Sequence, residues 1–182
     1  MVFNIPILLT YLRILAIPFM VALFYLDFPL TSAVVFALAG FTDWADGYLA
    51  RRWGQESRFG AFLDPVADKL MVAVALILIV ESQANIWVTL AAAIIISREL
   101  VISALREWMA EVGQRSKVAV AFTGKLKTAA QIMSLTFLLY DKPMLGLPLH
   151  EIGLFLLAIA TILTLWSMVL YLKDAFRPDT AE

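Results

Sequence analysis

Long apolar stretches, separated by short polar segments, run through nearly the whole of this 182-residue chain. Each holds about 20 mostly apolar residues, which is the length a helix needs to cross the hydrocarbon core of a bilayer. Because the connections are short, consecutive helices should run antiparallel. The pattern predicts one all-α integral membrane domain over residues 1–182, a bundle of six transmembrane helices at residues 8–26, 30–50, 64–80, 86–109, 118–140 and 152–172.

Composition agrees with this prediction and narrows the chemistry. The chain is 62% hydrophobic with a mean hydropathy of +0.86, whereas soluble domains are about 45–50% apolar even by a broader count. It contains no cysteine and a single histidine, His150, which excludes disulfides, a thiolate nucleophile and a Cys- or His-rich zinc site. Any metal must be held by oxygen ligands, which favours magnesium, manganese or calcium.

Basic residues predict how the bundle is oriented. We place thirteen of the fourteen on one side of the membrane and only Lys142 on the other. Because cytoplasmic loops are enriched in Lys and Arg, both termini should face the cytoplasm. The bundle is also expected to contain a polar cavity that opens to the cytoplasm. The thirteen are Arg13, Arg51, Arg52, Arg58, Lys69, Arg98, Arg106, Arg115, Lys117, Lys125, Lys127, Lys173 and Arg177.

Acidic and small residues form two helical stripes near the cytoplasmic side. Spacings of three or four residues place side chains on one helix face, and these spacings relate Asp43, Asp46, Gly47, Ala50 and Arg51 in the first stripe and Gly60, Asp64 and Asp68 in the second. Four carboxylates at bilayer depth would cost on the order of 10 kcal/mol without compensation. The alternative is that these carboxylates lie at helix ends and form ion pairs with Arg51, Arg52 and Lys69. Such ion pairs could account for a single Asp, but they do not explain four Asp residues on two matched stripes. We therefore expect the stripes to face each other across the hairpin at residues 52–59 and to hold one or two hard cations.

The pattern D-x2-D-G-x2-A-R-x8-G-x3-D-x3-D resembles the signature of the CDP-alcohol phosphotransferase family at every position. The resemblance implies a membrane enzyme, usually a homodimer, that transfers a substituted phosphate from a CDP-linked donor to an alcohol and releases CMP. It implies that two Mg²⁺ or Mn²⁺ ions are held by Asp43, Asp46, Asp64 and Asp68, and that Asp68 is also the general base. It further implies a pocket for the CDP moiety lined by Asp43, Gly47, Ala50, Arg51 and Gly60.

A second group of basic residues includes Arg98, Arg106, Lys125 and Lys127. These residues suit an anionic acceptor, since Arg and Lys bind phosphate. The alternative is cytoplasmic anchoring by snorkelling side chains, or neutralisation of Arg98 and Arg106 by Glu99 and Glu107. Residues 4–13, 97–100, 103–110 and 124–129 resemble the branch of the family whose acceptor is sn-glycerol 3-phosphate. That resemblance implies a phosphate site made by Arg106, Lys125 and Lys127, together with Arg98 and Thr10.

The expected partners are CDP-diacylglycerol, sn-glycerol 3-phosphate and the lipid bilayer of a bacterial cytoplasmic membrane, with no nucleic acid. The alternative within the same chemistry is that the acceptor is another alcohol, such as inositol phosphate, phosphatidylglycerol or serine. Intramembrane carboxylates also mark ion pathways, so a divalent-cation transporter is the rival from another class. Against it, no polar residues continue from the carboxylates toward the outer side. A purely structural scaffold is disfavoured by the free energy needed to bury the carboxylates.

Overall fold

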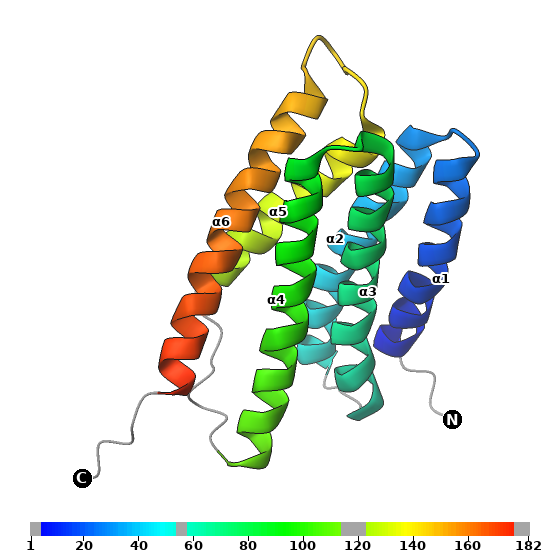
Figure 1. The fold of residues 1–182 in the computed structure, drawn as a ribbon. Coiled ribbons are helices and arrows are strands. Elements are labelled where there is room, and N and C mark those ends of the chain that lie inside the picture. The colour runs from blue at the N-terminus through cyan, green and yellow to red at the C-terminus, as the bar shows by residue number, and fades with distance from the viewer. Residues whose placement is uncertain (1–4, 54–57, 114–122, 177–182) are drawn as a thin grey trace.

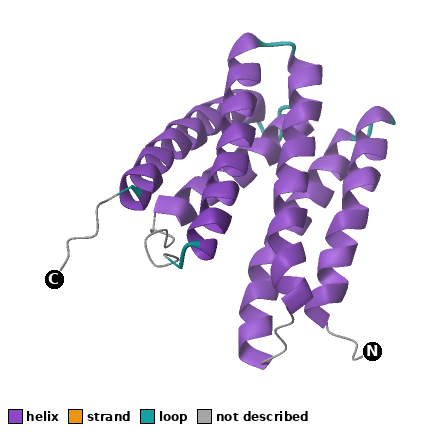
Figure 2. Ribbon diagram, turned by 60° about the horizontal axis from the view of Figure 1, so that its bottom comes forward, coloured by secondary structure: helices purple, strands orange, loops and turns teal. Residues whose placement is uncertain are grey.

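The computed structural model describes residues 5–53, 58–113 and 123–176, and within them every regular element is an α-helix (Figures 1 and 2). The prediction of an all-helical chain is confirmed, and each of the six expected helices is present. Their bounds are Ile5–Tyr25 (α1), Pro29–Trp53 (α2), Arg58–Gln83 (α3), Ile86–Glu111 (α4), Thr123–Tyr140 (α5) and Leu149–Ala175 (α6).

The largest difference from the predicted bounds is at α3, which begins at Arg58 instead of residue 64. Proline is favoured in the first turn of a helix and disfavoured in its interior. In the structure Pro65 lies inside α3. Tertiary packing of α3 on its neighbours overrides the local preference of one residue. The stripe formed by Gly60, Asp64 and Asp68 is consequently helical throughout.

The helices form a closed ring in the order α1, α2, α5, α6, α4 and α3, since each packs against the next and α3 packs against α1. Across the ring, α3 also packs against α5 and α2. Helix α1 begins and helix α6 ends at one end of the bundle, here called the terminal end, and the connections at residues 26–28, 84–85 and 141–148 lie at the other, the turn end (Figure 1). Because α3 contacts four other helices, it is the element that can bring their side chains to one site.

Most of the buried apolar side chains that the structure describes belong to two clusters, and several polar side chains are buried as well. The larger cluster joins all six helices toward the turn end and includes Met20, Leu76 and Ile95. The smaller one joins α4 and α6 toward the terminal end and consists of Ile102, Met109, Tyr171 and Ala175. The buried polar residues include Thr10, Arg13, Arg98, Lys127, Gln131 and Ser167. A polar layer inside such a bundle points to function, because uncompensated polar groups are expensive there.

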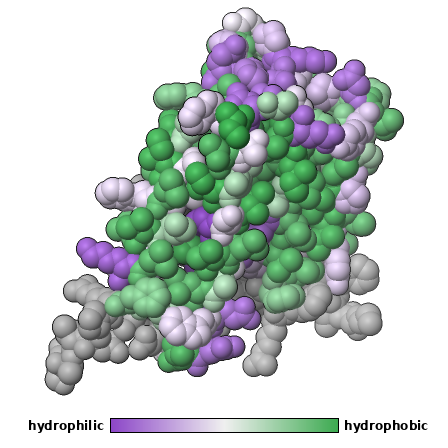
Figure 3. All heavy atoms as spheres, viewed as in Figure 1, coloured by the Kyte–Doolittle hydropathy of each residue, from purple (hydrophilic) through white to green (hydrophobic). Residues whose placement is uncertain are grey.

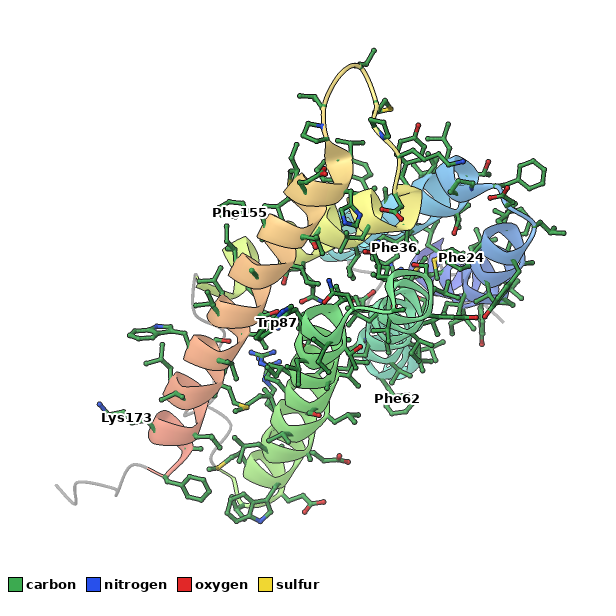
Figure 4. The ribbon with its side chains drawn as sticks, turned by 45° about the horizontal axis from the view of Figure 1, so that its top comes forward. Phe24, Phe36, Phe62, Trp87, Phe155 and Lys173 are labelled. Carbon is green, nitrogen blue, oxygen red and sulfur yellow. The ribbon has the colours of Figure 1, made fainter. Side chains whose placement is uncertain are left out.

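The outer surface is that of a membrane protein. Large apolar side chains are widely exposed, and Figure 4 shows Phe62 and Phe155 pointing away from the bundle. Among the residues that the structure describes, three helical stretches are long and apolar enough to cross a membrane, namely Leu8–Tyr25, Ile86–Glu111 and Leu149–Lys173. Figure 3 shows a mostly apolar face, with hydrophilic residues gathered at the turn end, in a small group in the middle and at a few places toward the terminal end.

Gly153 sets how closely α6 approaches α5. A Cβ at this position would lie 2.9 Å from Leu138 Cγ and 3.3 Å from Phe137 Cβ, and Ser134 Oγ donates a hydrogen bond to the Gly153 carbonyl at 2.8 Å. We expect Gly153→Leu to lower the thermal midpoint in detergent, because overpacking destabilises by about 1–3 kcal/mol. The control is Ala158→Leu at an exposed position of α6. Equal melting of the two variants would contradict this close packing.

Candidate active site

Two carboxylates of α3, one turn apart, face α1. Thr10 Oγ1 donates a hydrogen bond to Asp64 Oδ1, and Arg13 Nη1 donates to Asp68 Oδ1 at 2.9 Å. Thr10 and Arg13 are buried, whereas the Asp68 side chain is 40% exposed. Helix α1 therefore holds both carboxylates in place and leaves Asp68 accessible. Thr10, for which the family resemblance implied a role at the acceptor's phosphate, contacts a candidate metal ligand in the structure.

Asp68 lines a cavity of about 210 Å³ between α3, α4 and α5. Glu99 and Lys127 lie on its other walls, together with Pro65, Lys69, Val72, Thr128 and Gln131. A smaller cavity of about 80 Å³ is also lined by Asp68, and it includes Phe36 and Gly40 of α2. Asp68 therefore shares one cavity with residues of α2 and the other with Glu99 of α4 and Lys127 of α5.

Glu99 joins two buried cations. Its Oε1 accepts from Lys127 Nζ at 2.5 Å and from Arg98 Nη1 at 2.8 Å, and Arg98 Nη2 donates to Ser167 Oγ at 3.2 Å. In the part of the chain that the structure describes, α4 and α5 share no extensive packing, so the pair between Glu99 and Lys127 is a principal link between them. The expected neutralisation by Glu99 is confirmed for Arg98.

Arg106 and Arg98 both contact Tyr171. Arg106 Nη2 donates to the Tyr171 hydroxyl at 2.9 Å, and the guanidinium carbons of Arg98 and Arg106 lie 5.6 and 5.2 Å from the centre of the Tyr171 ring. Lys127, Arg98 and Arg106 carry three positive charges against the one negative charge of Glu99. The resulting formal charge of +2 matches a phosphate monoester dianion.

Several predicted site residues are placed only in part. Asp43, Asp46, Gly47, Ala50 and Arg51 belong to α2, which packs against α3, but their side chains lie outside the described residues. The same holds for the side chain of Lys125 in α5. Gly60 is buried in α3. Among the described side chains no three acidic or histidine residues gather at one point, and the four-aspartate metal site therefore stays a prediction.

The family model described as CDP-alcohol phosphatidyltransferase matches residues 3–170. The chain belongs to the CDP-alcohol phosphatidyltransferase family. It is therefore an enzyme, and the resemblance on which the sequence prediction depends is confirmed.

Relatives within the CDP-alcohol phosphatidyltransferase family are similar along almost their whole length. A protein of Pectobacterium atrosepticum is 56% identical over 185 residues, covering 100% of both chains. One of Salmonella typhimurium is 55% identical over 178 residues, covering 96% of each, and one of Shigella flexneri is 53% identical over 185 residues, covering 100% of both. All three carry the name CDP-diacylglycerol–glycerol-3-phosphate 3-phosphatidyltransferase.

The link between Glu99 and its two cations should matter for the stability of this phosphatidyltransferase. Glu99→Gln leaves Lys127 and Arg98 without their counter-charge, and removing one partner of a largely buried pair is destabilising. Because the Glu99 side chain is 25% exposed, we expect a moderate loss of about 1–3 kcal/mol, measured as a lower thermal midpoint in detergent. Glu107→Gln, at an exposed position of the same helix, is the matched control. Identical midpoints for both variants would show that the pair contributes nothing to stability.

Proposed function

We propose that this phosphatidyltransferase transfers the phosphatidyl group of CDP-diacylglycerol to sn-glycerol 3-phosphate, giving phosphatidylglycerol phosphate and CMP. One observation carries the proposal: Asp68 and Lys127 lie on the walls of a single cavity. A carboxylate that can accept a proton therefore shares a pocket with a cation that can hold a phosphate. The names of the relatives that are similar over the full length agree with this reaction.

The acceptor would lie with its phosphate against the cations and its primary hydroxyl toward Asp68. Lys127, Arg98 and Arg106 offer the charge and the hydrogen-bond donors that a phosphate dianion requires. Asp68 takes the proton from the hydroxyl, and the oxygen attacks the donor phosphorus that carries diacylglycerol. The bond from this phosphorus to the bridging oxygen breaks, and CMP leaves with that oxygen. Positioning and charge stabilisation suffice for such a displacement.

Two divalent ions, Mg²⁺ or Mn²⁺, belong to the proposal. Carboxylate oxygens are the ligands that these hard cations prefer. Asp64 and Asp68 lie one turn apart on α3, and Asp43 and Asp46 belong to the helix that packs against it. The ions would neutralise the diphosphate of the donor and the departing CMP. The CDP moiety would lie against α2 and α3, near Asp43, Gly47, Ala50, Arg51 and Gly60.

We also propose that all six helices span the cytoplasmic membrane of a bacterium, with the terminal end and the active site facing the cytoplasm. Lys142 lies in the connection at the turn end, whereas Arg106 and Lys173 lie in the terminal-end halves of α4 and α6. This distribution follows the positive-inside rule. The enzyme would act as a homodimer, as the family resemblance implies.

The experiment that tests the acceptor uses purified protein in lipid vesicles with labelled CDP-diacylglycerol. Glycerol 3-phosphate, inositol phosphate, phosphatidylglycerol and serine are supplied one at a time, and the lipid product and CMP are measured. We expect rapid turnover with glycerol 3-phosphate and little with the others. Faster turnover with another alcohol would show that this alcohol is the acceptor, and the proposed transfer from CDP-diacylglycerol would still hold.

The transporter alternative is tested separately with vesicles that contain the protein and no CDP donor. Uptake of Mn²⁺ into these vesicles above the level of protein-free vesicles would support transport. We expect no uptake, because the sequence predicts no polar residues that continue from the carboxylates toward the outer side of the membrane.

A further inference from the structure

Tyr171 is a buried aromatic residue for which neither the family signature nor the proposed reaction provides a role. It lies in the terminal-end part of α6 with 8% of its surface exposed, just beyond residue 170, where the match to the family model ends. Interfacial tyrosines that anchor a helix expose their hydroxyl to headgroups. The Tyr171 hydroxyl instead accepts a hydrogen bond from Arg106, so an anchoring role does not describe it.

The ring of Tyr171 brings together two cations that the helix alone would keep apart. Arg98 and Arg106 are eight residues apart on α4, which is about 12 Å along the helix axis. Both guanidinium groups nevertheless lie beside the same ring, at 5.6 and 5.2 Å from its centre. An apolar side chain would fill the space between Ile102, Met109 and Ala175 equally well, but it would attract neither cation.

An aromatic ring can hold cations in a way that a carboxylate cannot. A carboxylate that positions an arginine also cancels its charge, as Glu99 does with Arg98. The face of a tyrosine ring attracts a guanidinium through its quadrupole and leaves the positive charge in place. Arg106, held in this way, keeps its charge for an incoming dianion, and Arg98 is oriented by the same ring while it shares Glu99 with Lys127.

We propose that Tyr171 is a positioning residue that holds Arg98 and Arg106 as one clamp for the phosphate of the acceptor. This inference rests on the proposed function, because glycerol 3-phosphate supplies that phosphate. Tyr171 acts through the two arginines and does not itself touch the substrate.

The test compares Tyr171→Phe and Tyr171→Leu with the wild type, measuring kcat, the KM for each substrate and competitive inhibition by inorganic phosphate. Tyr171→Phe loses the hydrogen bond from Arg106, and a loss of ordinary net strength should raise the acceptor KM and the phosphate inhibition constant by about 3- to 10-fold. Tyr171→Leu, which also loses the ring, should raise both further. We expect kcat and the KM for CDP-diacylglycerol to change less than twofold in Tyr171→Phe.

Tyr25→Phe is the matched control, because it removes a hydroxyl that donates to Glu81 at the turn end, at 2.5 Å. It should leave every kinetic constant unchanged. An unchanged acceptor KM and phosphate inhibition constant in Tyr171→Phe would overturn the clamp, as would equal rises in the KM of both substrates. If the wild type fails to use glycerol 3-phosphate, the proposed function fails, and thermal stabilisation by inorganic phosphate then decides the clamp: it should be weaker in Tyr171→Phe than in the wild type.

Discussion

Replacement of Asp68 by Asn is expected to abolish CMP release and to leave the protein folded. Asparagine keeps the shape of the side chain and can still accept the hydrogen bond from Arg13. It cannot take a proton from the acceptor hydroxyl, and general-base catalysis contributes about 10²- to 10⁴-fold to a rate. The loss of a proposed metal ligand adds to the effect. CMP release from CDP-diacylglycerol, measured beside a thermal melting curve, checks both parts of the expectation.

Asp141→Asn is the matched control for Asp68→Asn. Asp141 lies at the turn end, where its Oδ1 is 2.5 Å from His150 Nδ1, far from the proposed reaction. We expect this variant to retain wild-type turnover. Turnover by Asp68→Asn within a few-fold of the wild type would remove Asp68 from the role of base.

Replacement of Lys127 by Met should give the second large effect, a fall of about 100-fold in kcat/KM for glycerol 3-phosphate. Methionine fills similar space without the charge. Truncating one member of a buried, hydrogen-bonded charge pair costs about 2–5 kcal/mol in binding, and the Lys127 side chain is only 5% exposed. The KM for CDP-diacylglycerol should stay close to the wild-type value, because the cavity that Lys127 lines includes no described residue of α2, the helix against which the CDP moiety is proposed to lie. Steady-state kinetics with each substrate varied in turn provide the measurement.

Lys142→Met removes an exposed lysine at the turn end and should leave both KM values unchanged. A parallel loss of affinity for both substrates in Lys127→Met would argue that Lys127 supports the fold instead of the acceptor. A loss confined to CDP-diacylglycerol would move Lys127 from the acceptor's phosphate to the donor's.

The helices could be predicted because their apolar character is visible in the sequence. Long apolar runs separated by polar segments indicate both the type and the number of the elements. The order of the helices around the ring could not be predicted in this way. Side chains that face lipid and side chains that face the core are equally apolar, so that Phe155, 67% exposed, and Leu157, 3% exposed, look alike in the sequence.

The candidate site was predictable where charge and spacing combined. Asp64, Asp68, Arg98 and Lys127 were recognised because charged residues in apolar surroundings require an explanation. Their partners were harder to find. The contact between Thr10 and Asp64 joins residues 54 positions apart, and the role of Tyr171 depends on α6 lying beside α4. A single tyrosine near the end of an apolar helix resembles any interfacial anchor, so its sequence context offered no signal.

One measurement tests most directly whether the aspartates and the basic pocket together cleave the donor. CMP release from CDP-diacylglycerol is followed with the purified enzyme after chelation of divalent ions, then after addition of Mg²⁺ or Mn²⁺, each time with and without glycerol 3-phosphate. We expect CMP only when both a divalent ion and glycerol 3-phosphate are present. CMP formed at the same rate in the chelator, or without the acceptor, would contradict the proposed reaction.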